Sequence, residues 1–129
     1  MAMIARAEGE LRILYVEDNE LIREMTSELL SRPGRRVVPV ASAEEAIAES
    51  ERNGLDVLIT DVSLPRMSGL DLARRLAHQR PRLPIIVITG YEWPGVLDGW
   101  DANAAVICKP VVSEQVEPLI EKLLQAAAG

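Results

Sequence analysis

The chain has 129 residues, 48% of them hydrophobic, so it has room for one compact domain. Its net charge of -6 and its few aromatic residues (two Trp, two Tyr and no Phe) oppose binding to nucleic acid, which needs basic and stacking surfaces. A single Cys forms no disulfide framework, and no apolar stretch approaches the roughly 20 residues that cross a bilayer, so we expect a cytoplasmic protein.

The predicted domain covers residues 11–127 and follows a short polar extension, residues 1–10. Its first element is a strand at residues 11–16, where an apolar run without regular alternation is typical of a strand buried on both faces. A helix follows and ends before Pro33 and Gly34, which do not continue helices. Four apolar residues at helical spacing define it: Leu21, Ile22, Met25 and Leu29.

The second strand is predicted at residues 36–40 and is the weakest of the set. It contains Pro39, which cannot donate a hydrogen bond to a neighbouring strand and therefore indicates a strand at the edge of a sheet. Ser42 and Glu45 then form a capping box, the pattern in which each side chain satisfies a free N–H at the start of a helix. Gly54 is the predicted end of this second helix.

The third strand is predicted at residues 57–60, where the chain is again continuously apolar or β-branched. Ser68 is the candidate N-cap of the third helix. Leu72 and Leu76 lie one turn apart on its apolar face, and Pro81 follows its end.

The last part of the chain predicts two strands, at residues 85–89 and 104–108. Gly and Pro residues between them oppose a regular helix, so we expect the fourth helix, within residues 90–103, to be short or irregular. A final helix has Ser113 as its candidate cap, and Pro118 predicts a late start or a bend. Its apolar stripe consists of Val116, Leu119, Ile120, Leu123 and Leu124.

Strands that alternate with helices in this way predict an α/β fold of the (βα)5 type, a doubly wound parallel sheet with helices on both faces. We expect the flavodoxin-like strand order 2-1-3-4-5. In such sheets the ligand site lies beyond the carboxyl ends of the strands, where the strand order reverses.

Polar residues follow the predicted strands at that edge. Glu17 and Asp18 follow the first strand, Asp61 the third, Thr89 ends the fourth and Lys109 follows the fifth. Three carboxylates so close together would repel one another unless a cation neutralised them, and oxygen ligands suit Mg²⁺. A lysine and a hydroxyl group can hold a transferring phosphoryl group, and one free carboxylate can act as its nucleophile.

At these residues the chain resembles the receiver domain of two-component response regulators over almost its full length. The match comprises the acidic pair Glu17-Asp18, the segment DVSLPRMSG from Asp61 to Gly69, Thr89-Gly90, and Lys109-Pro110.

The resemblance implies a role for each matched residue. Asp61 would be the phosphoacceptor, and Asp18, Asp61 and the carbonyl of Ser63 would bind the metal, with Glu17 acting through a metal-bound water. Lys109 and Thr89 would contact the phosphoryl oxygens. Backbone N–H groups of Val62, Ser63 and Gly90 would surround the phosphoryl group, and the peptide bond between Lys109 and Pro110 would be cis.

The chain departs from the family at one position of the fifth strand. Val106 stands where the family has an aromatic switch residue, three positions before the lysine. Thr89-Gly90-Tyr91 instead looks like the FATGUY subgroup, whose aromatic residue lies after the fourth strand. We therefore expect Tyr91, together with Thr89 and with Trp93 beside it, to carry the switch.

The expected function is that of a phosphoacceptor in a phosphorelay, in a protein that catalyses only its own phosphorylation and dephosphorylation. The implied partners are a sensor histidine kinase or histidine phosphotransfer protein and a downstream protein target; we expect a monomer without nucleic-acid or membrane contacts. The alternatives are a pseudo-receiver that binds constitutively and a receiver excised from a hybrid histidine kinase. A small-molecule phosphatase would usually need a second acid at the position of Ser63.

Overall fold

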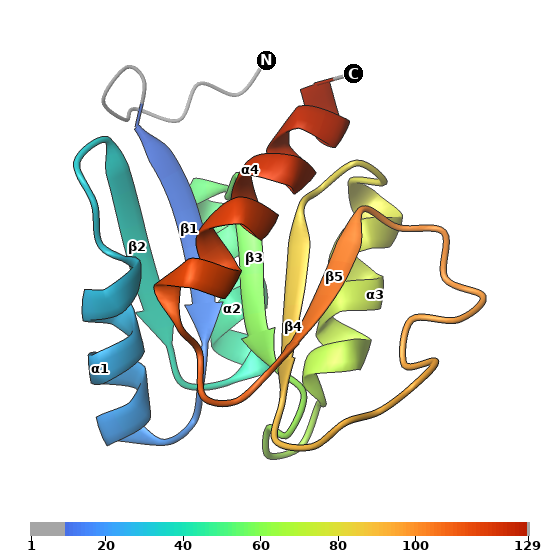
Figure 1. Ribbon diagram of the computed structural model, residues 1–129, viewed down its shortest axis with the longest axis horizontal. Helices are drawn as coiled ribbons and strands as arrows, with labels where there is room; N and C mark the ends of the chain where they lie inside the picture. Colours follow the sequence, from blue (N-terminus) through green and yellow to red (C-terminus); the bar gives the residue numbers. More distant parts are fainter. Residues whose placement is uncertain (1–9, 129) are drawn as a thin grey trace.

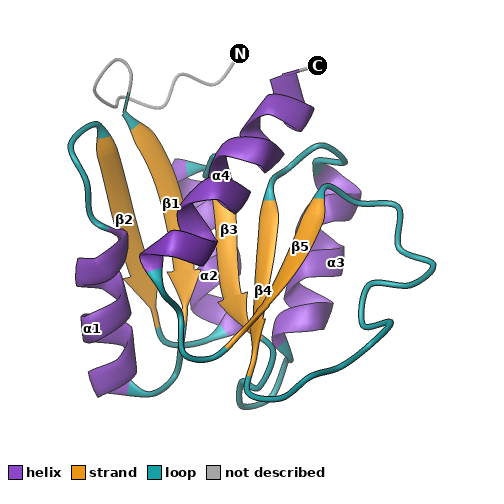
Figure 2. Ribbon diagram, viewed as in Figure 1, coloured by secondary structure: helices purple, strands orange, loops and turns teal. Residues whose placement is uncertain are grey.

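The computed structural model describes residues 10–128 and contains a five-stranded parallel sheet between two layers of helices (Figures 1 and 2). The strands follow the predicted order, β2-β1-β3-β4-β5. They are β1 (Leu11–Val16), β2 (Arg35–Val40), β3 (Val57–Asp61), β4 (Ile85–Thr89) and β5 (Ala104–Cys108). The helices are α1 (Glu20–Leu30), α2 (Ala43–Asn53), α3 (Gly69–Gln79) and α4 (Ser113–Ala128). Residues 1–9, most of the expected extension, lie outside the described part.

The sheet separates two hydrophobic clusters because successive residues of a strand point to opposite faces. On β1, Leu14 packs in the cluster beneath α2 and α3, whereas Ile13 and Tyr15 pack in the cluster beneath α1 and α4. Both faces of the central strands are therefore buried, which explains their continuous apolar sequences. As predicted, β2 lies at the edge, where Pro39 pairs with β1 alone.

Local signals set the helix ends. Ser42 caps α2 by accepting a hydrogen bond from the N–H of Glu45 at 3.1 Å, and Ser68 caps α3 through the N–H of Asp71. Of the late start or bend expected from Pro118, the late start is wrong, because α4 already begins at Ser113, the residue expected to precede it as the cap, and includes Pro118 in its second turn. Pro118 is the sixth residue of α4 and lies just beyond the four N–H groups that have no helical acceptor, so the helix forgoes one hydrogen bond, to the carbonyl of Glu114.

The connection from β4 to β5 contains no helix in residues 90–103, where we expected a short or irregular one. Gly95 and Gly99 have φ of 79° and 71°, outside the helical region, and the chain instead forms consecutive four-residue β-turns. Val96, Leu97 and Trp100 still pack against the hydrophobic cluster on the α3 side. The connection itself runs along the outside of β5 and α3 (Figure 1).

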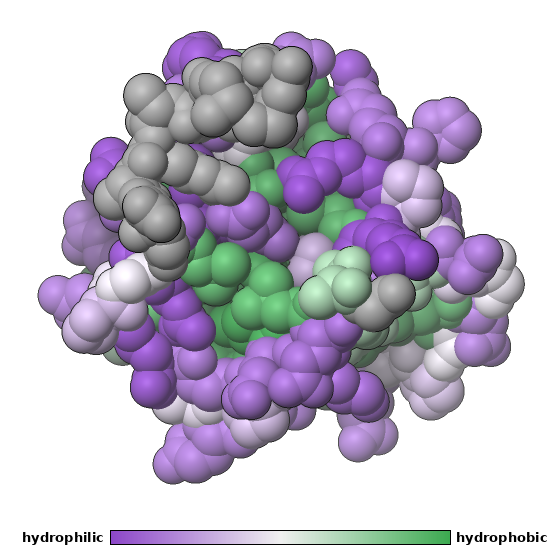
Figure 3. Space-filling model, turned by 90° about the horizontal axis from the view of Figure 1, so that it is seen from above, coloured by the Kyte–Doolittle hydropathy of each residue, from purple (hydrophilic) through white to green (hydrophobic). Residues whose placement is uncertain are grey.

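The two edges of the sheet differ in character. Viewed from the amino-terminal edge, hydrophobic residues gather in the middle of the molecule and hydrophilic residues surround them (Figure 3). Leu11, Leu83 and Leu124 line a hollow at this edge. At the carboxyl edge, at the bottom of Figure 1, the strands end at or directly before Glu17, Asp61, Thr89 and Lys109. Within residues 10–128, no helix has the length and apolar character needed to cross a membrane.

Candidate functional site

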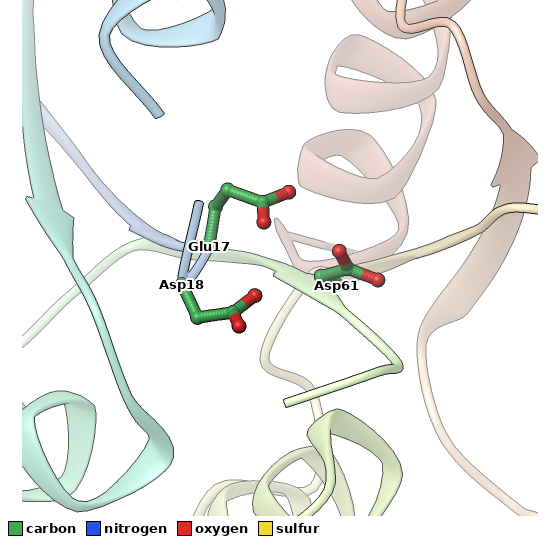
Figure 4. A group of neighbouring side chains, drawn as sticks. All are labelled: Glu17, Asp18 and Asp61. Atoms are coloured by element: carbon green, nitrogen blue, oxygen red, sulfur yellow. The ribbon is translucent and has the colours of Figure 1, made fainter. Parts of the chain in front are cut away.

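Three acidic side chains meet at the carboxyl edge, between β1 and β3, where the strand order reverses. One carboxylate oxygen from each of Glu17, Asp18 and Asp61 lies within 4.8 Å of the others (Figure 4). Glu17 and Asp61 are buried, with 2% and 3% of their surface exposed, whereas Asp18 faces solvent. Carboxylate oxygens at this spacing, open to water on one side, fit a hard divalent cation such as Mg²⁺.

Lys109 completes the cluster from the end of β5. Its Nζ lies 2.8 Å from Oδ2 of Asp61 and 3.5 Å from Oε1 of Glu17. Burial lowers the pKa of Lys109, but the hydrogen bond and charge of Asp61, together with Glu17, outweigh it, so the pKa is raised and the ammonium stays charged. The predicted cis peptide bond between Lys109 and Pro110 is present.

Burial raises the pKa of Glu17, because it disfavours the charged carboxylate, and the neighbouring Asp61 raises it further. The N–H of Asn19, which donates to Oε2 of Glu17 at 3.0 Å, and the charge of Lys109 oppose this shift without cancelling it. The two buried carboxylates, those of Glu17 and Asp61, therefore repel each other. A bound cation would relieve this repulsion.

The backbone around Asp61 is closely packed. The N–H of Ser63 donates to Oδ1 of Asp61 at 3.1 Å, so it already faces the carboxylate. The N–H of Val62 instead donates to the carbonyl of Ile88, and a contact with a phosphoryl group would require that bond to break. A Cβ at Gly69 would lie 1.8 Å from the carbonyl oxygen of Asp61, so only glycine fits at the first position of α3.

Thr89 lies at the same edge, but its hydroxyl group is engaged elsewhere. It donates to the carbonyl of Tyr91 at 2.9 Å and accepts from the N–H of Tyr91 at 3.3 Å. Tyr91 is 61% exposed, and its ring stacks on that of Trp93, with 6.1 Å between ring centroids. Sγ of Cys108 lies 3.8 Å from the same Tyr91 carbonyl, and Gly90 is exposed between these residues.

Two residues of the β1–α1 loop and of α1 support the acids and were missed by the sequence analysis. Asn19 caps α1 by accepting from the N–H of Ile22 at 2.9 Å, which an Asn directly before a helical pattern could have indicated. Nη1 of Arg23 donates to the carbonyls of Glu17 and Asp18. No sequence signal indicates that contact, because arginine is an ordinary exposed helical residue.

An apolar surface lies next to the acids on α1. Leu21 and Met25, two of the residues that predicted this helix, are 65% and 61% exposed, because α1 packs on the sheet mainly through Thr26 and Leu30. A groove of about 440 Å³ runs from Ile22, Met25 and Leu29 to Lys109, Pro110 and Val111. Exposed apolar surface of this kind typically marks a contact with another protein.

The sequence matches the family described as the response regulator receiver domain over residues 13–121. It is 32% identical over 118 residues to the response regulator receiver protein CpdR of Brucella abortus, covering 90% of this chain and 98% of CpdR. It is 34% identical over 121 residues to the two-component response regulator PhoP of Pseudomonas aeruginosa, covering 92% of this chain. The chain spans only 54% of the length of PhoP.

Solved structures agree with these matches. A CheY-like response regulator receiver domain protein from Methanospirillum hungatei superimposes with a TM-score of 0.79 at 29% identity. The superposition covers 92% of this chain and 97% of that one.

Proposed function

Because the chain belongs to the response regulator receiver domain family of two-component systems, we propose that Asp61 accepts a phosphoryl group in a Mg²⁺-dependent reaction. The protein would then signal through contacts with other proteins. The observation that carries this proposal is the contact of Lys109 with the carboxylate of Asp61 at 2.8 Å, inside a cluster of three acids.

The chain's own groups suit the transfer of a phosphoryl group. A carboxylate oxygen of Asp61 attacks phosphorus, the bond from phosphorus to the donor nitrogen breaks, and its electron pair stays on that nitrogen. Lys109 places a positive charge beside the oxygens that gain negative charge, and the N–H of Ser63 can donate to them. Asp18, Asp61 and the carbonyl of Ser63, with Glu17 beside them, would hold Mg²⁺, which neutralises phosphoryl charge when bound.

A sensor histidine kinase or histidine phosphotransfer protein is the proposed phosphodonor. Leu21, Met25 and the groove that leads to Lys109 offer apolar surface for that protein beside the acceptor. The protein would act as a monomer in the cytoplasm, on its own phosphorylation and dephosphorylation only, and pass the signal to a downstream protein without binding nucleic acid.

Mass spectrometry after incubation with acetyl phosphate and Mg²⁺ tests the phosphoacceptor role. We expect one phosphoryl group on the wild type, none on Asp61→Asn, and one on Asp101→Asn, a control in the exposed β4–β5 connection. EDTA should abolish the labelling. If no mass gain depends on Asp61, the protein is instead a constitutive binding module.

Signalling would start at Thr89. Its hydroxyl group can turn to a phosphoryl oxygen only if it leaves the carbonyl of Tyr91, its present acceptor. Losing this bond would release the exposed, stacked side chains of Tyr91 and Trp93. In this proposal the pair performs the switch role that an aromatic residue at the position of Val106 has in other receivers. Amide chemical shifts of residues 90–103 should change on phosphorylation, and less so in Thr89→Val. Unchanged shifts in the wild type would contradict this switch.

A further inference from the structure

The loop between β1 and α1 consists of Glu17, Asp18 and Asn19, so two of the three acids lie in one tight connection. Arg23, in the first turns of α1, folds back over this connection. Its Nη1 lies 2.8 Å from the carbonyl oxygen of Glu17 and 3.3 Å from that of Asp18. On the other side, the N–H of Glu17 donates to the carbonyl of Val40 on β2. The main chain of the acidic pair is therefore held from both sides.

The two acids differ in what fixes their side chains. The carboxylate of Glu17 has its own partners, the N–H of Asn19 and the ammonium of Lys109. Asp18 is exposed, and its carboxylate accepts no hydrogen bond from the residues that the structure describes. The direction in which the Asp18 side chain points therefore depends on the main chain of Asp18, whose carbonyl accepts a hydrogen bond from Arg23. Hydrogen bonds from a charged donor are stronger than neutral ones.

We propose that Arg23 is a positioning residue for the metal site: its guanidinium group holds the carbonyls of Glu17 and Asp18 so that their carboxylates face Asp61. The inference rests on the proposed function, because Mg²⁺ is the cation expected there. Arg23 itself touches neither the metal nor the phosphoryl group.

Charge and geometry predict opposite effects of removing Arg23. If the guanidinium acted only through its charge, Arg23→Gln would remove a positive charge near the acids and tighten the binding of Mg²⁺. If it acts by fixing the loop, Arg23→Gln loosens Asp18 and weakens the binding. Losing a residue that orients metal ligands typically lowers metal affinity by about tenfold or more, so we expect a loss of about tenfold. The sign of the change thus separates the two roles.

Calorimetric titration of the unphosphorylated full chain with Mg²⁺ measures this affinity directly. Arg23→Gln is compared with Arg75→Gln, which removes an exposed arginine from α3 on the opposite face of the sheet and should bind like the wild type. Arg23→Lys, whose ammonium group bonds fewer acceptors in a fixed geometry, should bind with intermediate affinity. Labelling by acetyl phosphate should be slow in Arg23→Gln at low Mg²⁺ and return to the wild-type rate at saturating Mg²⁺.

Two results would overturn the inference: affinity for Mg²⁺ in Arg23→Gln equal to or tighter than that of the wild type, or a labelling rate that stays low at saturating Mg²⁺. If Arg23→Gln does not fold, Arg23→Lys decides, and wild-type affinity in that variant counts against the inference. Failure of the proposed function looks different, because the wild type itself would then neither bind Mg²⁺ nor become labelled on Asp61.

Discussion

At the scale of single residues, Asp61 is held through both its side chain and its main chain. Lys109 contacts its carboxylate, and the N–H of Ser63 donates to it as well. The first residue of α3, Gly69, packs against its carbonyl so closely that no other residue fits. Gly69 belongs to the motif that matched the family, and the close approach explains why a glycine is needed there.

Gly69→Ala should destabilise the protein and slow its phosphorylation. The new Cβ would overlap the Asp61 carbonyl, so α3 or the end of β3 must shift, at a cost of about 1 to 3 kcal/mol. Urea unfolding measures this loss. Gly90→Ala is the matched control, because a Cβ there meets nothing within 4 Å, and its free energy of unfolding should stay within about 0.5 kcal/mol of the wild type. Equal effects at both glycines would contradict the steric explanation.

At the scale of elements, α4 is tied to the edge strand by one ion pair. Both Nη atoms of Arg35, the first residue of β2, donate to the carboxylate of Glu117 on α4, at 2.8 and 2.9 Å. Nε of Arg32 lies 3.2 Å from the same carboxylate. The hydrogen bonds from Arg35 lower the pKa of Glu117 below its ordinary value of 4.5, although partial burial opposes the shift.

Glu117→Gln should destabilise the protein in a pH-dependent way. A carboxyl group whose pKa is lower in the folded state contributes stability above pH 4.5, and this contribution is lost as the pH falls through the folded-state pKa. We expect a loss of about 1 to 2 kcal/mol at pH 7 that shrinks as the pH falls below 4.5. Urea unfolding at neutral and acidic pH measures the difference. Glu121→Gln, one turn further along α4, is the control, and a deficit that does not change with pH would contradict the ion-pair explanation.

At the scale of the whole molecule, folding places three negatively charged side chains, those of Glu17, Asp18 and Asp61, next to one another at one edge of the sheet. The chain has a net charge of -6, and three of its acids share one space. A cation that binds only the folded state stabilises it by mass action, by roughly 1.4 kcal/mol at a concentration tenfold above its Kd.

Mg²⁺ should therefore raise the melting temperature of the unphosphorylated protein by about 3 to 6 °C under that condition. Differential scanning calorimetry with and without Mg²⁺ measures the shift, with KCl at the same ionic strength to account for screening of the net charge. Asp18→Asn should lose most of the shift. A rise of the same size in that variant would show that the effect does not come from this site.

The sequence by itself determined the order and type of the strands, the places of α1, α2 and α3, the caps of α2 and α3 at Ser42 and Ser68, and the strand ends that carry the acids and Lys109. These features are readable because apolar runs and capping residues act over a few neighbouring positions. Parallel strands then bring their carboxyl ends to one edge whatever the details of packing. The meeting of Glu17, Asp18, Asp61 and Lys109 followed from that topology.

Only the tertiary structure decided the contacts that depend on distances between elements. The hydroxyl of Thr89 could have faced Asp61 or the next loop, and the turn after β4 set its bond to Tyr91. The contact of Arg23 with the acidic loop depends on the direction in which α1 leaves β1. The β4–β5 connection has no helix because Gly95 and Gly99, at positive φ, form turns. Its apolar side chains still pack against the hydrophobic cluster on the α3 side. Such outcomes depend on packing between residues far apart in the chain, which periodicity and caps do not encode.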